Sequence, residues 1–262
     1  MTGAAVLLPF GYTLFVWWFS TGAILYLDGL PQRTHRWTMA GATALAVAAL
    51  YVLQSTAHDD GLPAAYAAFT AAIVVWGWVE MAFLLGWVTG PRTGACPPGA
   101  RGWRRAGYAF EAILWHEFAL LGGALVIALA TWNADSHLGL WSYLLLWLAR
   151  LSTKLNLFFG VRNLGEDLLP DHLRYLHTYF ARRPMNALFP LSLAGGVAAA
   201  VLLWQAAQQT PAGGDAAGLA LLATLATLAV LEHLFLVVPI NVNALWEWGL
   251  WSRRIEPPAT GT

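Results

Sequence analysis

The stretch EAILWHEF, residues 111–118, places ionisable side chains in an otherwise apolar part of the chain. Glu111, His116 and Glu117 lie between Tyr, Ala and Phe on one side and Leu, Gly, Ala, Val and Ile on the other. Carboxylates and imidazoles in such surroundings can bind a metal ion or pass protons. A neutral histidine can also ligate the magnesium of a chlorophyll.

Ionisable residues also interrupt apolar segments elsewhere in the chain. Arg150 and Lys154 are four residues apart, which places both on one face of a helix. In a membrane, each charge facing lipid would cost about 2.5–3.5 kcal/mol, so we expect these groups to meet one another. We therefore predict a polar cluster inside a helix bundle, made of Glu80, Glu111, His116, Glu117, Arg150, Lys154, Glu232 and His233.

This cluster has one structural and three functional interpretations. The structural one is that ion pairs only hold the helices together. A metal site, with an unknown metal, is a weaker match, because di-metal bundles use Glu-x-x-His, whereas Glu111 and His116 are five residues apart and Glu232 and His233 are adjacent. A proton or solute path lacks the paired broken helices of transporters. For a bound pigment, His116 and His233 are the candidate ligands.

Composition indicates the solvent in which the chain folds. It is 58% hydrophobic and 11% charged, whereas soluble domains are about 25% charged. Runs of roughly 20 apolar residues can cross the hydrocarbon core as helices. We predict an all-α, polytopic membrane helix bundle that forms a single domain over residues 1–262, with seven spans at about 6–28, 38–54, 63–89, 108–131, 138–159, 187–207 and 217–239.

Arginine placement predicts the orientation, because short cytoplasmic loops retain Lys and Arg. The loops after spans 1, 3 and 5 and the segment after span 7 contain arginine, whereas the loops after spans 2, 4 and 6 contain none. We therefore expect the N-terminus outside and the C-terminus in the cytoplasm. The second span is rich in small residues, and Ala40, Ala44 and Ala48 favour its close packing on another helix.

The cytoplasmic connection 160–186 has an amphipathic pattern. Pro170 can open a helix, and Pro184 can stop it. We predict a helix that lies on the inner leaflet or docks a partner protein, through Leu169, Leu173, Arg174, Leu176, Phe180, Arg182 and Arg183.

Motifs of common enzymes are absent from the sequence. It contains no P-loop, no Gly-rich dinucleotide fingerprint and no Gly-x-Ser-x-Gly elbow, so an enzyme is the less favoured class. The net charge of zero gives no electrostatic basis for binding nucleic acid.

Three blocks of the sequence resemble a known family. They are TGPRTGACPPGARGWRRAGYAFEAILWHEFAL, LARLSTKLNLFFGVRNLGEDLLPDHLRYLHTYFARRPMNALFP and AVLEHLFLVVP. Together with the span pattern, they are similar to PuhE, the photosynthetic complex assembly protein 2 family of anoxygenic phototrophic bacteria. The resemblance runs from about Trp78 to Trp248 and continues more weakly into the first spans.

This resemblance implies a location and a role. It implies a multi-pass protein of the bacterial inner membrane, cytoplasmic or intracytoplasmic, that helps to assemble the reaction centre and the core light-harvesting complex. Its expected partners are the lipid bilayer and reaction-centre and core antenna subunits or other assembly factors, and the implied cofactor is bacteriochlorophyll. Two alternatives stay open: a membrane enzyme that acts on a pigment or lipid through a metal or acid–base site, and a permanent subunit of the mature complex.

Overall fold

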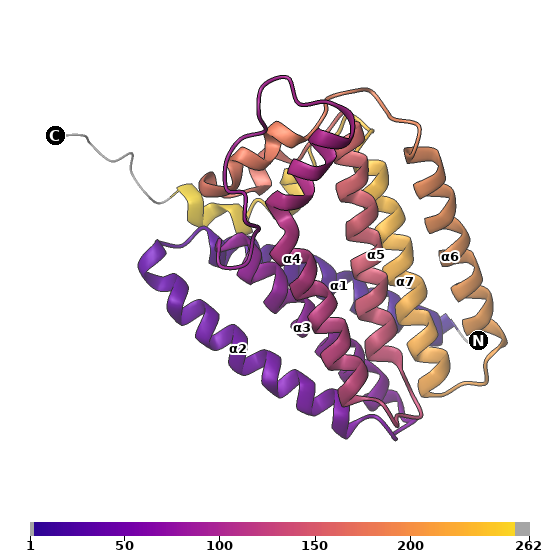
Figure 1. Ribbon diagram of the computed structural model, residues 1–262. Helices are drawn as coiled ribbons and strands as arrows, with labels where there is room; N and C mark the ends of the chain where they lie inside the picture. Colours follow the sequence, from indigo (N-terminus) through magenta and orange to yellow (C-terminus); the bar gives the residue numbers. More distant parts are fainter. Residues whose placement is uncertain (1–2, 255–262) are drawn as a thin grey trace.

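Seven long helices make up most of residues 3–254, the part of the chain that the computed structural model describes (Figure 1). They are α1 (Gly3–Asp28), α2 (Gln32–Ser55), α3 (Leu62–Leu84), α4 (Gly102–Ala130), α5 (Leu138–Phe159), α6 (Phe189–Gln209) and α7 (Gly214–Phe235). Four short 3-10 helices join or follow them: η1 (Glu166–Leu168), η2 (Asp171–Tyr179), η3 (Val242–Trp246) and η4 (Gly249–Arg254). These described residues form no β-strand, which confirms the all-α fold class.

The helices are those of a multi-pass membrane protein. Six of them, α1 to α4, α6 and α7, are long and apolar enough to cross a membrane. The fifth predicted span coincides with α5, which carries Arg150 and Lys154 and is not among the six. Even so, α5 runs from one end of the bundle to the other: Leu138 contacts α7 near its start, and the Leu157 carbonyl accepts a hydrogen bond from Ala181.

The connections between helices gather at the two ends of the bundle. At one end, the Tyr179 hydroxyl donates to the Gly94 carbonyl over 2.7 Å, and the Asn163 N–H donates to the Leu236 carbonyl over 2.9 Å. At the other end, the Asp135 N–H donates to the Ala57 carbonyl over 2.9 Å. The arginine-containing connections therefore share one end, which we call the arginine end. Its predicted location in the cytoplasm remains a prediction.

Three helix boundaries differ clearly from the predicted spans. Helix α3 ends at Leu84 instead of residue 89, because Gly86 adopts a φ of 78° and two capping hydrogen bonds close the helix. The Trp87 N–H donates to Ala82 and the Gly86 N–H to Phe83, the pattern of a Schellman cap. Helices α2 and α4 each begin six residues before the predicted span, at Gln32 and Gly102.

Helices α3 and α7 form the centre of the bundle, with α2 and α6 at opposite sides (Figure 1). Small residues of α7, such as Ala220 and Ala223, are fully buried and let its neighbours approach closely. The packing face predicted for α2 is wrong. Its alanine stripe is exposed, and α2 packs through Met39, Ala46, Ala49 and Leu53 instead. The reason is that Met39 and Leu53 on this face bury large apolar side chains in the core, which the stripe does not offer.

Candidate functional site

A cavity of about 820 Å³ opens between α4 and α5 near the arginine end. Helices α1, α3 and α7 contribute to its wall, and most of the lining side chains are apolar. The ionisable residues on the wall come from four helices: Glu80 of α3, Glu117 of α4, Arg150 and Lys154 of α5 and Glu232 of α7. The structure thus brings five of the eight predicted cluster residues to one cavity.

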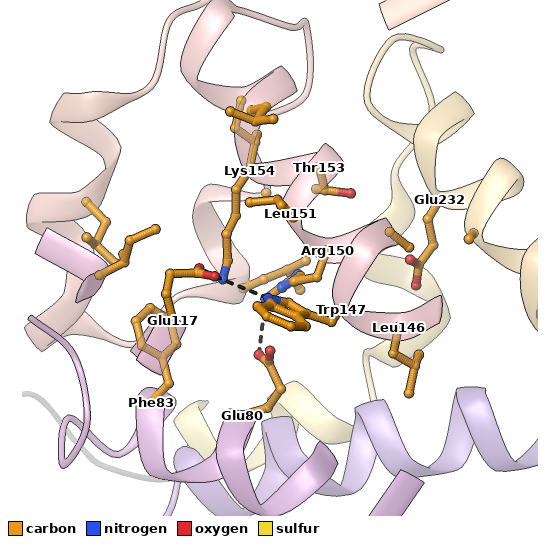
Figure 2. A pocket seen from close by; sticks show the side chains of 18 of the residues that line it. Glu80, Phe83, Glu117, Leu146, Trp147, Arg150, Leu151, Thr153, Lys154 and Glu232 are labelled. Carbon is orange, nitrogen blue, oxygen red and sulfur yellow. Dashed lines mark hydrogen bonds and ion pairs between the residues drawn. The ribbon is translucent and has the colours of Figure 1, made fainter. Parts of the chain in front are cut away.

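Four of these five residues form two ion pairs across the cavity (Figure 2). The Lys154 ammonium lies 2.6 Å from Glu117 Oε1, and the Arg150 guanidinium lies 3.4 Å from Glu80 Oε2. The four-residue spacing of Arg150 and Lys154 points both side chains of α5 toward the acids of α3 and α4. Trp147 joins the group, because its indole N–H donates to Glu117 Oε2 over 3.3 Å.

Glu232 stands apart from the two ion pairs (Figure 2). Its carboxylate accepts a hydrogen bond of 2.7 Å from the indole N–H of Trp17 on α1. Trp17 was not among the predicted site residues, because nothing in the spacing of the chain indicates that residues 17 and 232 meet. Only the packing of α1 against α7 brings them together.

The two histidines proposed as pigment ligands do not line the cavity. His116 is fully buried behind the wall, with its ring 4.3 Å from that of Phe83 and its Nε2 3.6 Å from Glu80 Oε1. Both ring nitrogens of His233 are engaged, one with the Ala229 carbonyl and the other with the Ser152 hydroxyl, each at 2.8 Å. Their role as pigment ligands remains a prediction.

Glu111 lies outside the cavity, where it pairs with Arg92 of the loop between α3 and α4 over 3.0 Å. Among residues 3–254, no group of three or more His, Cys, Asp or Glu side chains is placed to hold a metal ion.

The mouth of the cavity is exposed and apolar. Its rim includes Phe110 and Phe118 of α4 and Leu155 and Phe159 of α5, each more than 40% exposed. The opening faces sideways, between two helices that run through the bundle.

The segment predicted as a cytoplasmic docking helix differs from that prediction. Residues 171–179 form a 3-10 helix, and Leu173 and Leu176 are buried against Phe83, Leu84 and Ala112 of α3 and α4. The apolar stripe is therefore used within the protein and closes the arginine end, with partly buried Leu169 and Phe180 beside it. Arg174, Arg182 and Arg183 remain exposed, and the first two pair with Asp171 and Glu166.

Comparison with known proteins places the chain in a family. The sequence model of a family described as "Protein of unknown function (DUF3623)" matches residues 4–256. A Rhodobacter capsulatus protein described as "Uncharacterized 30.4 kDa protein in puhA 5'region" is 38% identical over 251 residues, which cover 94% of this chain and 91% of that protein. No solved structure matches the chain. The protein therefore belongs to the DUF3623 family, and the PuhE-type resemblance of its motifs is confirmed.

Proposed function

We propose that this protein is an assembly factor for the photosynthetic reaction centre and core light-harvesting complex in the bacterial inner membrane. The family membership supports this proposal, because a relative is described by its position beside puhA, a photosynthesis gene. In this proposal the protein shelters an apolar component in the cavity between α4 and α5 until that component reaches its final partner.

The cavity itself is the observation that carries the proposal. Four of its five ionisable groups form ion pairs, Lys154 with Glu117 and Arg150 with Glu80, so these four need no ligand to balance them. The fifth, Glu232, accepts a hydrogen bond from Trp17. The remaining wall is mostly apolar, which suits a guest with a large hydrophobic surface. Such a site binds its guest and releases it unchanged, so we assign no catalytic residue.

The volume of the cavity favours a pigment over a transmembrane helix. One turn of an α-helix, about 10 Å wide and 5.4 Å high, occupies roughly 400 Å³. The cavity of about 820 Å³ would hold two such turns, far fewer than a membrane span needs. Small-molecule pockets measure about 300–1,000 Å³, and bacteriochlorophyll is therefore the guest that we propose.

A lateral entrance requires that α5 crosses the membrane, and we propose seven spans with the arginine end in the cytoplasm. Ion pairing explains how α5 could do so, since both its basic side chains meet acids of neighbouring helices. The cavity then lies in the inner half of the bilayer and opens toward lipid.

The experiment compares two tryptophan variants of α5. Leu155 lines the cavity and is 41% exposed, whereas Leu148, two turns earlier, does not line it and is 63% exposed. Wild type, Leu155→Trp and Leu148→Trp are purified in mild detergent from phototrophically grown cells. Absorption spectra then give the bound bacteriochlorophyll per protein.

We expect pigment with wild type and Leu148→Trp and much less with Leu155→Trp, because the added ring narrows the cavity. Equal pigment in all three proteins, or none in wild type, would contradict the proposal. Recovery of the protein at equal stoichiometry with the finished reaction centre would identify a permanent subunit instead.

A further inference from the structure

A second cavity, of about 600 Å³, lies at the arginine end, away from the cavity between α4 and α5. It is formed by the start of α2, the turn that follows α3 and the start of η2. Four of its lining residues are basic or can become so: Arg33, His35, Arg36 and His172. No acidic residue lines it, so the cavity is positively charged.

The two arginines have no carboxylate partner among the described residues. Arg92, Arg150, Arg182 and Arg253 each lie beside an acid, whereas the Arg33 side chain forms no hydrogen bond or ion pair within residues 3–254. The guanidinium of Arg36 lies 5.2 Å from the ring centre of Trp37 and beside no acid in that part of the chain. Both side chains are exposed and able to bind an anion.

The histidines complete the wall. Burial lowers the pKa of His172, so this ring is neutral at pH 7. His35 is 9% exposed, and its Nε2 lies 2.9 Å from the Leu30 carbonyl, which holds the ring in place. Arg33 and Arg36 give the cavity a permanent positive charge.

The turn after α3 shapes the floor of this cavity. A Cβ atom at Gly86 would lie 3.1 Å from the His172 ring, and the φ of 78° disfavours any other residue there. The Schellman cap that ends α3 thus brings η2 close to α2.

Residues around the cavity mark a membrane–water boundary. Trp37 and Trp87 are 68% and 57% exposed, as expected for tryptophans at the level of lipid headgroups. Below Arg36, at four-residue steps along α2, lie the exposed residues Ala40, Ala44 and Ala48. Their small side chains leave the surface of α2 open along this line.

We propose that this cavity binds the phosphate headgroup of an anionic phospholipid, with Arg33 and Arg36 as its ligands and an acyl chain along the exposed alanines of α2. Basic pockets between helices at the cytoplasmic surface bind such headgroups in other membrane proteins. Arginine suits this role, because its guanidinium can donate two hydrogen bonds to one phosphate. The site does not depend on the pigment cavity or on its guest.

The test uses a double variant and a control with the same change in charge. Arg33→Gln/Arg36→Gln removes the two ligands. Arg101→Gln/Arg104→Gln removes two exposed arginines at the start of α4 that do not line the cavity. Each purified protein is titrated with phosphatidylglycerol and, separately, with phosphatidylcholine, and bound lipid is counted by native mass spectrometry. Melting temperatures verify that the variants are folded.

We expect wild type and the control to bind one phosphatidylglycerol in preference to phosphatidylcholine, and Arg33→Gln/Arg36→Gln to bind it about tenfold or more weakly. Equal weakening in both double variants would show a general charge effect and overturn the proposal. Displacement of the lipid by millimolar inorganic phosphate would also overturn it, because the site would then be one for free phosphate.

Discussion

At the scale of single residues, four of the five ionisable groups on the cavity between α4 and α5 form ion pairs. The side chains of Lys154 and Glu117 are 19% and 12% exposed, and their contact is the shorter of the two ion pairs. Removal of one member leaves the other buried without its counter-charge, which is costlier than removal of both. The arrangement explains how an apolar bundle can hold these four charged groups around one opening.

A double-mutant cycle measures this pairing. We expect Lys154→Met to lower the free energy of unfolding by about 3 kcal/mol, because the Glu117 carboxylate would keep only the weak hydrogen bond from Trp147. Lys154→Met/Glu117→Gln should recover part of the loss, since no unpaired charge remains. Thermal unfolding in detergent gives the values. If each single variant is as stable as wild type, the pair does not stabilise the bundle.

Also at the residue scale, we expect Arg150 to contribute less to the stability of the fold than Lys154. Its side chain is 43% exposed, and its contact with Glu80 is 3.4 Å long. Arg150→Leu should still lower the melting temperature, because the Glu80 side chain is only 9% exposed and loses its basic partner. An unchanged yield and melting temperature would mean that this pair does not hold the helices together.

At the scale of elements, the loop after α3 fits against α4 through a glycine. A Cβ atom at Gly90 would lie 2.0 Å from the Glu111 carbonyl oxygen, a backbone atom that cannot move away easily. The His116 N–H also donates to the Thr89 carbonyl over 2.9 Å, so the loop and helix are in direct backbone contact. We expect Gly90→Ala to destabilise the protein by about 1–3 kcal/mol in thermal unfolding.

The control for this prediction is Gly122→Ala, in the interior of α4. A Cβ atom there would meet nothing within 4 Å, and alanine favours a helix over glycine by up to about 1 kcal/mol. This variant should therefore be neutral or more stable than wild type. A similar loss of stability in both variants would show that the close contact at Gly90 does not cause the destabilisation.

Helix α1 and the C-terminal segment are joined by an ion pair at the arginine end. The Arg253 guanidinium contacts both oxygens of Asp28, at 2.8 and 3.1 Å, and also the carbonyls of Asp167 and Leu168. The Asp28 side chain is fully buried. We expect Arg253→Gln to loosen residues 242–253 from α1, which limited proteolysis would detect as faster cleavage in this segment.

Arg182→Gln is the matched control for this ion pair. Arg182 pairs with Glu166 on the surface, where both side chains are about half exposed or more, and such pairs contribute about 0–1 kcal/mol. Cleavage of residues 242–253 should then proceed as in wild type. Equal rates in both variants would contradict a special role of the buried pair.

At the scale of the whole molecule, the number of spans decides on which side each loop lies. If α5 crosses the membrane, the loops before and after it lie on opposite sides. Asn133 and Arg162, both exposed, lie in these two loops. In a Cys96→Ser background, a membrane-impermeant maleimide should label Asn133→Cys in spheroplasts and Arg162→Cys only in inverted vesicles. Labelling of both from the same side would show that α5 does not cross.

The sequence by itself determined the all-helical membrane fold, the positions of the long helices and the family. Long apolar runs and the charges that interrupt them are local features, which can be read directly from the sequence. The helix ends that were predicted wrongly also depend on local features, such as the glycine cap that ends α3. The pairing of ionisable groups could be expected in general, because single charges are too costly in lipid. The sequence could not predict which acid would pair with which base.

Only the tertiary structure decided those partners. The contact of Trp17 with Glu232, the withdrawal of His116 behind the cavity wall and the burial of Leu173 and Leu176 against α3 and α4 all depend on how distant helices cross. An amphipathic stripe indicates that its apolar face will be covered. That face can be covered equally well by lipid, by a partner protein or by the protein's own helices. The choice among them is a property of the packed bundle, because it depends on shape and on contacts far apart in the chain.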